Sequence, residues 1–259
     1  MSKISVFGDS FAGFDITTGL EYKHWLGQLK AHQGYDNSNL LLTAAGGSGP
    51  MDHIHQFFQH IPDVENSNLL IFVWSQSSRL FHEKIRDINV GSAINPLARQ
   101  YVPSTAEEDR IYDIALEYYK EFYHEKTEEI KMVGLLQWFD RILLELCPDK
   151  KIFHFQSFTT CRENDEEKLN DQTLYHNFKS GINVAPPLMY LSENEPNYTG
   201  LGTKDKRPGH LNQDNHNLVF EKLKAGWDKN KGDIILLNDN YKPSYTLDFY
   251  SENWKDVWR

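Results

Sequence analysis

Apolar residues along the chain gather in short runs that alternate with longer stretches of mixed polar and apolar character. The runs are rich in Ile, Val, Leu and Phe, which is typical of strands buried inside a sheet. The clearest run is residues 68–75, where six apolar residues follow one another. We expect strands at residues 4–7, 39–45, 68–75, 151–158 and 182–190, and an extra strand at 234–237.

Between these runs, apolar residues recur at three- and four-residue spacing, which predicts amphipathic helices. Gly134 lies inside the longest helical pattern and predicts a kink or a break between two helices. Residues 80–105 lack clear periodicity, so we expect a long loop there, a candidate lid. The helices are expected at residues 21–31, 50–60, 107–146 and 215–227.

Strands that alternate with helices predict an α/β fold with a mostly parallel sheet covered on both faces. We divide the chain into one domain at residues 1–231, which carries a helical insertion at about 106–148, and a C-terminal extension at 232–259. We expect this extension to pack on the domain or on a partner, and it is a candidate surface for homo-oligomer formation. Its aromatic residues are Tyr241, Tyr245, Phe249, Tyr250, Trp254 and Trp258.

Composition narrows the partners and the compartment. The 259 residues include 27 Lys and Arg against 37 Asp and Glu, a formal net charge of −10. This charge argues against nucleic acid and anionic membranes as partners, because both are negatively charged and bind positively charged protein surfaces. The chain has 2 cysteines, shows no secretory leader before the first strand, and has no apolar run near the ~20 residues that cross a bilayer. We therefore expect a cytoplasmic protein without a membrane segment.

Residues suited to chemistry follow several of the predicted strands. The turn Gly8-Asp9-Ser10 ends the first strand and would hold the Ser10 hydroxyl at the carboxyl edge of the sheet. The Gly46-Gly47-Ser48 turn would expose backbone N–H groups to an anion, but no Walker lysine follows it, which argues against a nucleotide loop. The polar segment 74–79 follows the third strand, and Gly209-His210-Leu211-Asn212 precedes the last helix.

These four blocks, in this order, resemble those of the SGNH hydrolases, also called the GDSL esterase/lipase family. The resemblance spans roughly residues 3–228 and implies a flavodoxin-like, three-layer α/β/α fold. It implies that Ser10 is the nucleophile and that His210 is the base that removes its proton. It also implies that Gly47, with Gly46 close behind, donates a backbone N–H to the oxyanion.

The third block departs from the family pattern. The family has Gly-x-Asn-Asp there, and its asparagine is an oxyanion donor, whereas this chain has Trp-Ser-Gln-Ser-Ser-Arg. Gln76 is our candidate for this donor because its amide is chemically nearest, and Ser75 and Arg79 are the alternatives. We assign Asp9 and Arg79 as candidate substrate-binding residues.

The acid of the triad also departs from the family pattern. The family has an aspartate three positions before the histidine, and this chain has Arg207 there. Asp205 is the candidate substitute; without it, the site is a Ser-His dyad.

The resemblance implies a serine esterase that hydrolyses a small acyl ester, with an O-acetyl group on a carbohydrate as one candidate substrate. We expect no organic cofactor and no metal, since His53 and His55 lie two apart on a predicted helix and point to different sides. The alternative is a catalytically degenerate member of the fold with a binding or structural role. The aromatic tail and the Trp-Ser-x-x-x-Arg block resemble phage-encoded members of the family, for which that role would lie in the virion or in host takeover.

Overall fold

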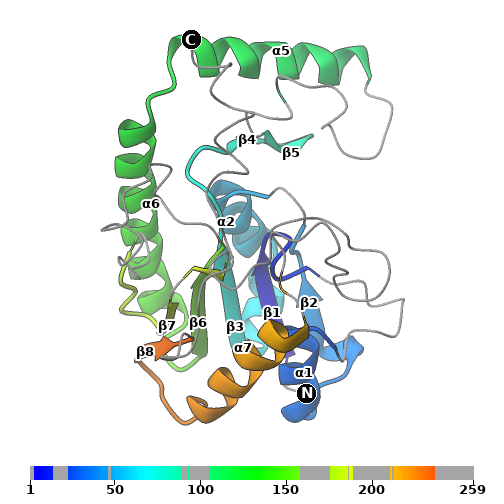
Figure 1. Ribbon diagram of the computed structural model, residues 1–259, viewed down its shortest axis with the longest axis vertical. Helices are drawn as coiled ribbons and strands as arrows, with labels where there is room; N and C mark the ends of the chain where they lie inside the picture. The colour runs from blue at the N-terminus through cyan, green and yellow to red at the C-terminus, as the bar shows by residue number, and fades with distance from the viewer. Residues whose placement is uncertain are drawn as a thin grey trace.

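The computed structural model describes residues 3–13, 23–45, 48–88, 93, 105–157, 176–185, 187–188, 211 and 213–236. Its centre is a six-stranded parallel sheet with the order β2-β1-β3-β6-β7-β8 (Figure 1). The strands are β1 (Lys3–Gly8), β2 (Leu40–Leu42), β3 (Ser67–Trp74), β6 (Lys151–Gln156), β7 (Ile182–Ala185) and β8 (Gly232–Ile235).

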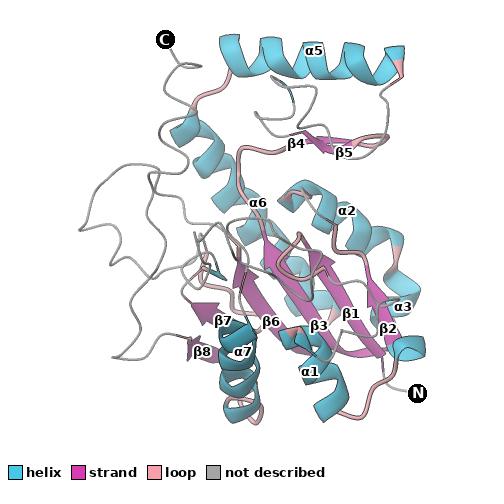
Figure 2. Cartoon of the chain, turned by 45° about the vertical axis from the view of Figure 1, so that its right-hand side comes forward, coloured by secondary structure: helices cyan, strands magenta, loops and turns pink. Residues whose placement is uncertain are grey.

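Helices cover both faces of this sheet, which confirms the predicted three-layer α/β/α architecture (Figure 2). One face packs against α1 (Trp25–His32) and α7 (Gln213–Ala225). The other face packs against α2 (Pro50–Gln59), α3 (Ile61–Glu65) and the later part of α6 (Glu125–Leu146). A short 3₁₀ helix, η2 (Asn37–Asn39), leads into β2.

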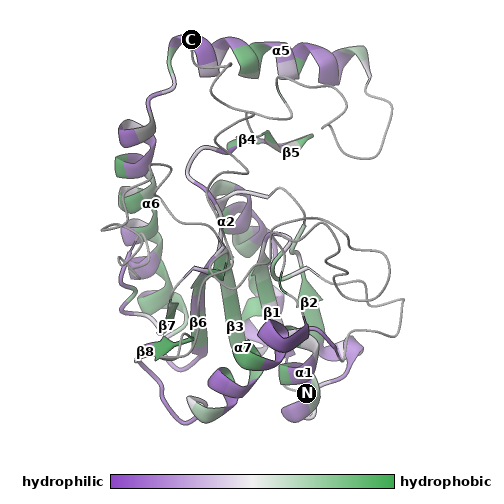
Figure 3. Ribbon diagram, viewed as in Figure 1, coloured by the Kyte–Doolittle hydropathy of each residue, from purple (hydrophilic) through white to green (hydrophobic). Residues whose placement is uncertain are grey.

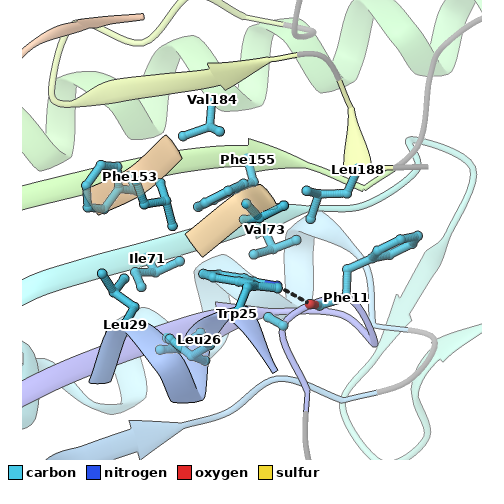
Figure 4. Close-up of a cluster of buried hydrophobic side chains, with 14 of the residues drawn as sticks. Phe11, Trp25, Leu26, Leu29, Ile71, Val73, Phe153, Phe155, Val184 and Leu188 are labelled. Atoms are coloured by element: carbon cyan, nitrogen blue, oxygen red, sulfur yellow. Dashed lines mark hydrogen bonds between the residues drawn. The ribbon is translucent and has the colours of Figure 1, made fainter. Parts of the chain in front are cut away.

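Strand alternation divides the core into two clusters, because successive side chains of a strand point to opposite faces. Ile71 and Val73 of β3 lie in the cluster beneath α1 and α7, whereas Phe72 lies in the cluster beneath α2 and α6. All three are fully buried. Figure 3 shows β3, at the centre of the sheet, as a hydrophobic strand, and Figure 4 shows the α1 side of the core.

An insertion between β3 and β6 rises beyond the carboxyl ends of the strands (Figures 1 and 2). It consists of the antiparallel hairpin β4 (Leu80–His82) and β5 (Arg86–Ile88), the helix α5 (Ala106–Glu121) and the start of α6. These elements have their own small core, which includes Ile88, Ile111 and Tyr119. We call this part of the chain the cap.

The sequence-based boundaries were wrong at three places. Residues 80–88 form a hairpin and not a loop, because strands of three residues are too short to show periodicity. The break in the long helical region falls at residues 122–124 and not at Gly134. Gly134 lies inside α6, and a Cβ added there would have no atom within 4 Å. The strand β2 is shorter than predicted and only half-buried, because it lies at the edge of the sheet.

The remaining strands and helices agree with the predictions to within a few residues, and α1 begins at Trp25 after its N-cap His24. The first residues of the C-terminal extension form β8, which pairs in parallel with β7 at the sheet edge. The aromatic residues of the tail lie outside the described residues.

Candidate functional site

The strand order creates a switch point between β1 and β3. After β1 the chain passes to β2 on one side, and it then crosses to β3 on the other side of β1. In open α/β sheets of this order, ligands bind outside the carboxyl ends of the strands at the point where the winding direction reverses. The segments that leave β1 and β3 at this point are Gly8-Asp9-Ser10 and residues 75–79.

The turn after β1 is fixed by hydrogen bonds on both sides of Ser10. The Asp9 carbonyl accepts from the amides of Ala12 (3.1 Å) and Gly13 (3.0 Å), and the Asp9 Oδ1 atom accepts from the amide of Phe11 (3.0 Å). The side chain of Ser10 is partly exposed and makes no hydrogen bond within the described part of the chain. A rigid turn therefore presents a free hydroxyl at the switch point.

Packing fixes the same turn against β3 and α1. A Cβ on Gly8 would lie 2.9 Å from the Val73 Cβ and 3.0 Å from the Ala12 Cβ, so the close approach of β1 to β3 here requires glycine. The Trp25 indole Nε1 donates to the Phe11 carbonyl at 3.0 Å (Figure 4). The turn is therefore part of the core and not a loose loop.

The second block supplies a buried polar contact behind this turn. The Ser48 hydroxyl lies 2.7 Å from the carbonyl oxygens of both Gly8 and Ala45, and the His53 Nε2 atom lies 3.3 Å from the Ser48 Oγ. This is a serine-histidine contact, but Ser48 and His53 are both buried and the hydroxyl donates to the backbone. Its role is to fasten the second block to the end of β1. Gly46 and Gly47 lie outside the described residues.

The neighbouring histidine of α2 points elsewhere, as the sequence predicts. The His53 ring lies 5.9 Å from the Trp74 ring, whereas the His55 ring lies 5.2 Å from the Phe81 ring of β4. Within the part of the chain that the structure describes, no three His, Cys, Asp or Glu side chains gather in a way that could hold a metal ion.

The third block connects the sheet to the cap. The Arg79 Nη1 atom donates to the Ser48 carbonyl at 2.7 Å, which joins the second and third blocks. The Tyr119 hydroxyl of α5 lies 2.7 Å from the carbonyl oxygens of Ser78 and Ile88, and burial raises the pKa of this phenol far above its usual range. Gln76 is partly exposed and makes no hydrogen bond to any described residue.

Asp9 and Ser75 differ from Ser10 in exposure. Both are fully buried, and the Asp9 Oδ2 and the Ser75 Oγ have no hydrogen-bond partner. Ser157, which follows β6, has the same two properties. The sequence pattern did not single out Ser157, although its position immediately after a strand is the same as that of Ser75.

His210 and Asp205 lie outside the described residues, but the residues that follow them are positioned. Leu211 is buried in the same core cluster as Phe11. The Gln213 side chain donates to the Lys23 carbonyl at 2.9 Å, and the amide of Trp25 donates to the His216 Nδ1 at 3.4 Å. The start of α7 therefore lies beside the start of α1, at the same edge of the sheet as Ser10.

A buried histidine lies beneath the site, on the α6 face of the sheet. The Trp74 indole Nε1 donates to the His154 Nδ1 at 3.3 Å, so the ring proton is on Nε2, which lies 3.1 Å from the Ser180 Oγ. The imidazole stacks on the Phe178 ring with the centroids 3.8 Å apart. Burial lowers the pKa of His154 to about 3, so the ring is neutral.

The same polar network ends on a carboxylate of α6. Burial alone would raise the pKa of Asp140, but the amide of Lys179, the amide of Ser180 and the ring of His176 donate to it and hold the pKa below its ordinary value. These contacts fix residues 176–180 before β7. Asp140 therefore positions backbone and has no contact with the switch point among the described residues.

No protein-family model, no curated protein and no solved structure matches the chain. Among the described helices, none has both the length and the apolar character needed to span a bilayer.

Proposed function

We propose that this chain is a serine hydrolase of the SGNH type that acts on small acyl esters, with an O-acetyl group on a carbohydrate as one candidate substrate. One observation carries the proposal: a partly exposed serine hydroxyl, free of hydrogen bonds among the described residues, stands on a rigid turn at the switch point of a parallel sheet. A capping serine would instead donate to or accept from the turn around it.

The chemistry requires a base and a set of oxyanion donors. Ser10 Oγ attacks the ester carbonyl while His210 takes its proton, and the amides of Ser10 and Gly47, with Gln76, stabilise the negative oxygen. His210 then protonates the departing alcohol. Water, activated by the same imidazole, releases the acid from the acyl-enzyme. Asp205 orients the imidazole in the triad form of the proposal and is dispensable in the dyad form.

The position of α7 supports the assignment of His210. Leu211 belongs to the same core cluster as Phe11, and His216 accepts from the amide of Trp25, whose indole donates to the carbonyl of Phe11. The described residues that follow His210 in the sequence therefore pack against the start of α1. The partly exposed Gln76 follows the neighbouring strand at the same edge.

The proposed enzyme is cytoplasmic and acts on a small-molecule or carbohydrate ester without a metal or an organic cofactor. Two cysteines in 259 residues and a net charge of −10 favour a reducing compartment and argue against a nucleic-acid partner. The aromatic tail remains our candidate for homo-oligomer contacts.

The test compares wild type with Ser10→Ala and with the matched control Ser77→Ala, a partly exposed serine of the third block. We expect wild type and Ser77→Ala to bind a fluorophosphonate probe covalently and to hydrolyse p-nitrophenyl acetate. Ser10→Ala should lose the label, and its turnover should fall by about 10³-fold or more. An Asp205→Asn variant with an unchanged rate would favour the dyad.

The second candidate is a degenerate member of the same fold that binds a partner or serves in a virion. The absence of the family's asparagine from the third block favours this role. So does Arg79, because its guanidinium donates to a backbone carbonyl of the protein itself, that of Ser48. Absence of both label and turnover in wild type would contradict the hydrolase and support this role.

A further inference from the structure

One carbonyl oxygen at the end of β1 holds both residues that flank the Gly46-Gly47 pair. The Gly8 carbonyl accepts from the amide of Ala45 at 3.1 Å, and the Ser48 Oγ lies 2.7 Å from the same oxygen. The amide of Ser48 also donates to the Ala45 carbonyl at 3.2 Å. Because Gly8 comes two residues before Ser10, these contacts hold the second block in register with the turn that carries the proposed nucleophile.

Arg79 holds the same serine from the side of the third block. Its Nη1 atom donates to the Ser48 carbonyl at 2.7 Å, a hydrogen bond that the guanidinium charge strengthens. Ser48 is buried, so water hardly reaches this part of the chain. Loss of the guanidinium would therefore leave a buried carbonyl without a strong donor, which costs more than the loss of a surface contact.

The helix α2 adds a third contact to Ser48. The hydroxyl proton of Ser48 is directed at the backbone carbonyls, so its oxygen accepts from the His53 Nε2 at 3.3 Å. The amide of His53 donates to the Gly49 carbonyl at 3.1 Å, which fixes the residue after Ser48 as well. The end of β1, the segment after β3 and the start of α2 thus all converge on Ser48.

We propose that Arg79 and Ser48 are positioning residues for the oxyanion site. The inference rests on the proposed function, in which the amide of Gly47 stabilises the negative oxygen. Gly47 is joined to Ser48 by one peptide bond, so the contacts of Ser48 determine where that bond begins and which way it runs. Arg79 then has a role other than the substrate binding or oxyanion donation expected from its place in the third block.

The position of an oxyanion donor has a large effect on rate. Such a donor acts only when its N–H is already aimed at the place where negative charge develops, and a displacement of about 1 Å can lower the rate by about 10²-fold. Glycine restricts the backbone less than any other residue. At a glycine donor the restraint must therefore come from its neighbours, and here Ser48 and Arg79 supply it.

Pre-steady-state acylation by p-nitrophenyl acetate tests this role, because it separates the acylation rate from the ester concentration at half saturation. All measurements are made below the melting temperature of every variant, so that unfolding does not lower the rate. Arg79→Met removes the donor but keeps an apolar stem. We expect its acylation rate to fall by about 10- to 100-fold, while the half-saturating concentration changes by less than about twofold.

Two companion variants and two controls sharpen this test. Ser48→Ala, which frees the second block from Gly8, should show the same pattern as Arg79→Met. Arg79→Lys keeps a charged donor for the Ser48 carbonyl and should recover most of the rate. The controls are Arg141→Met, at an exposed arginine of α6, and Ser77→Ala, and both should acylate as wild type does.

Amide hydrogen exchange measures the same contacts without any substrate. The amides of Ala45 and Ser48 both donate to backbone carbonyls, so their exchange reports how firmly the second block is held. We expect exchange at these two amides to become at least about 10-fold faster in Arg79→Met and to stay at the wild-type rate in Arg141→Met.

A raised half-saturating concentration with an unchanged acylation rate in Arg79→Met would assign Arg79 to substrate binding and overturn the proposal. An unchanged rate in both Arg79→Met and Ser48→Ala would overturn it too, and it would leave the hydrolase in place. Absence of acylation in wild type removes the hydrolase instead. The exchange measurement then still decides whether Arg79 holds the second block, and unchanged exchange would show that it does not.

Discussion

The buried imidazole of His154 makes a sharp prediction about acid stability. In the folded protein burial lowers its pKa to about 3, against an ordinary value of 6.5. Below pH 6.5 the unfolded chain therefore binds a proton at this residue, while the folded chain does not. Stability must fall as the pH drops from about 6.5 toward 3, and His154 contributes no pH dependence above that range.

The magnitude follows from proton linkage. Each pH unit between the two pKa values changes the free energy of unfolding by up to about 1.4 kcal/mol, so the loss between pH 6.5 and about 4.5 amounts to about 2.5 kcal/mol. That is a large share of the roughly 5–15 kcal/mol that stabilises a typical domain. The depressed pKa of Asp140 adds its own loss only at lower pH, as this carboxylate becomes protonated.

The assay is urea unfolding, followed by circular dichroism at several pH values, of wild type and His154→Phe. The phenyl ring keeps the stacking on Phe178 but leaves Trp74 Nε1 and Ser180 without their partner, which costs about 1–3 kcal/mol at neutral pH. The variant should then lose about 2.5 kcal/mol less than wild type on acidification to about pH 4.5.

His32→Phe, which removes an exposed imidazole, controls for the general effect of the substitution. Other titrating groups are common to all three proteins, so the comparison isolates the buried ring. Parallel pH curves for wild type and His154→Phe would refute the reasoning, because they would mean that His154 takes up its proton in the folded state as readily as in the unfolded chain.

Three further outcomes follow from the packing. Gly8→Ala should destabilise the protein by about 1–3 kcal/mol in urea unfolding, because its Cβ would approach a β3 side chain to 2.9 Å. The matched change Gly134→Ala, in open space on α6, should stabilise it by about 0.5–1 kcal/mol, and the opposite ranking would contradict the geometry. Tyr119→Phe should speed amide hydrogen exchange in residues 80–88 while global unfolding changes by no more than about 2 kcal/mol; unchanged exchange would mean that this hydroxyl does not anchor the cap. Burial raises the pKa of Cys147 to about 11, so in a Cys161→Ser background iodoacetamide should alkylate the folded protein at least about 100-fold more slowly than the unfolded protein, and equal rates would show an accessible thiol.

The sequence was sufficient for the sheet because each central strand is buried on both faces. Every side chain of residues 69–74 is buried and apolar, so β3 stands out as one continuous run, and β1 and β6 are also buried although they include Ser5, His154 and Gln156. The Gly-Asp-Ser turn and the start of α2 at Pro50 could also be located, because local chemistry determines them.

The cap could not be predicted in the same way. Its hairpin has three-residue strands, and its helices are joined at residues 122–124 by a segment without glycine or proline. The contact that holds it in place, from Tyr119 to the carbonyls of Ser78 and Ile88, joins residues 41 and 31 positions apart. Such long-range contacts leave no periodic signal in the sequence.

The buried polar atoms of the site were hidden for a related reason. The contact of the Ser48 hydroxyl with the Gly8 carbonyl and the neighbouring positions of Ser75 and Ser157 depend on which strands become neighbours, and not on spacing along the chain. A serine directly after a buried strand was the one available signal. It was used for Ser75 and overlooked for Ser157.

The position of the cap follows from the topology. The chain leaves β3 at the carboxyl edge of the sheet, and it must return along α6 to the opposite edge before it can enter β6 in parallel. A segment inserted at the start of this crossover therefore begins and ends above the carboxyl ends of the strands, where parallel sheets bind their ligands. The same connection that completes the fold thus places β4, β5 and α5 beyond the carboxyl ends of the strands. If the proposed hydrolase activity holds, changes in the length of this insertion should alter which esters react before they alter the stability of the sheet, because the cap has a small core of its own.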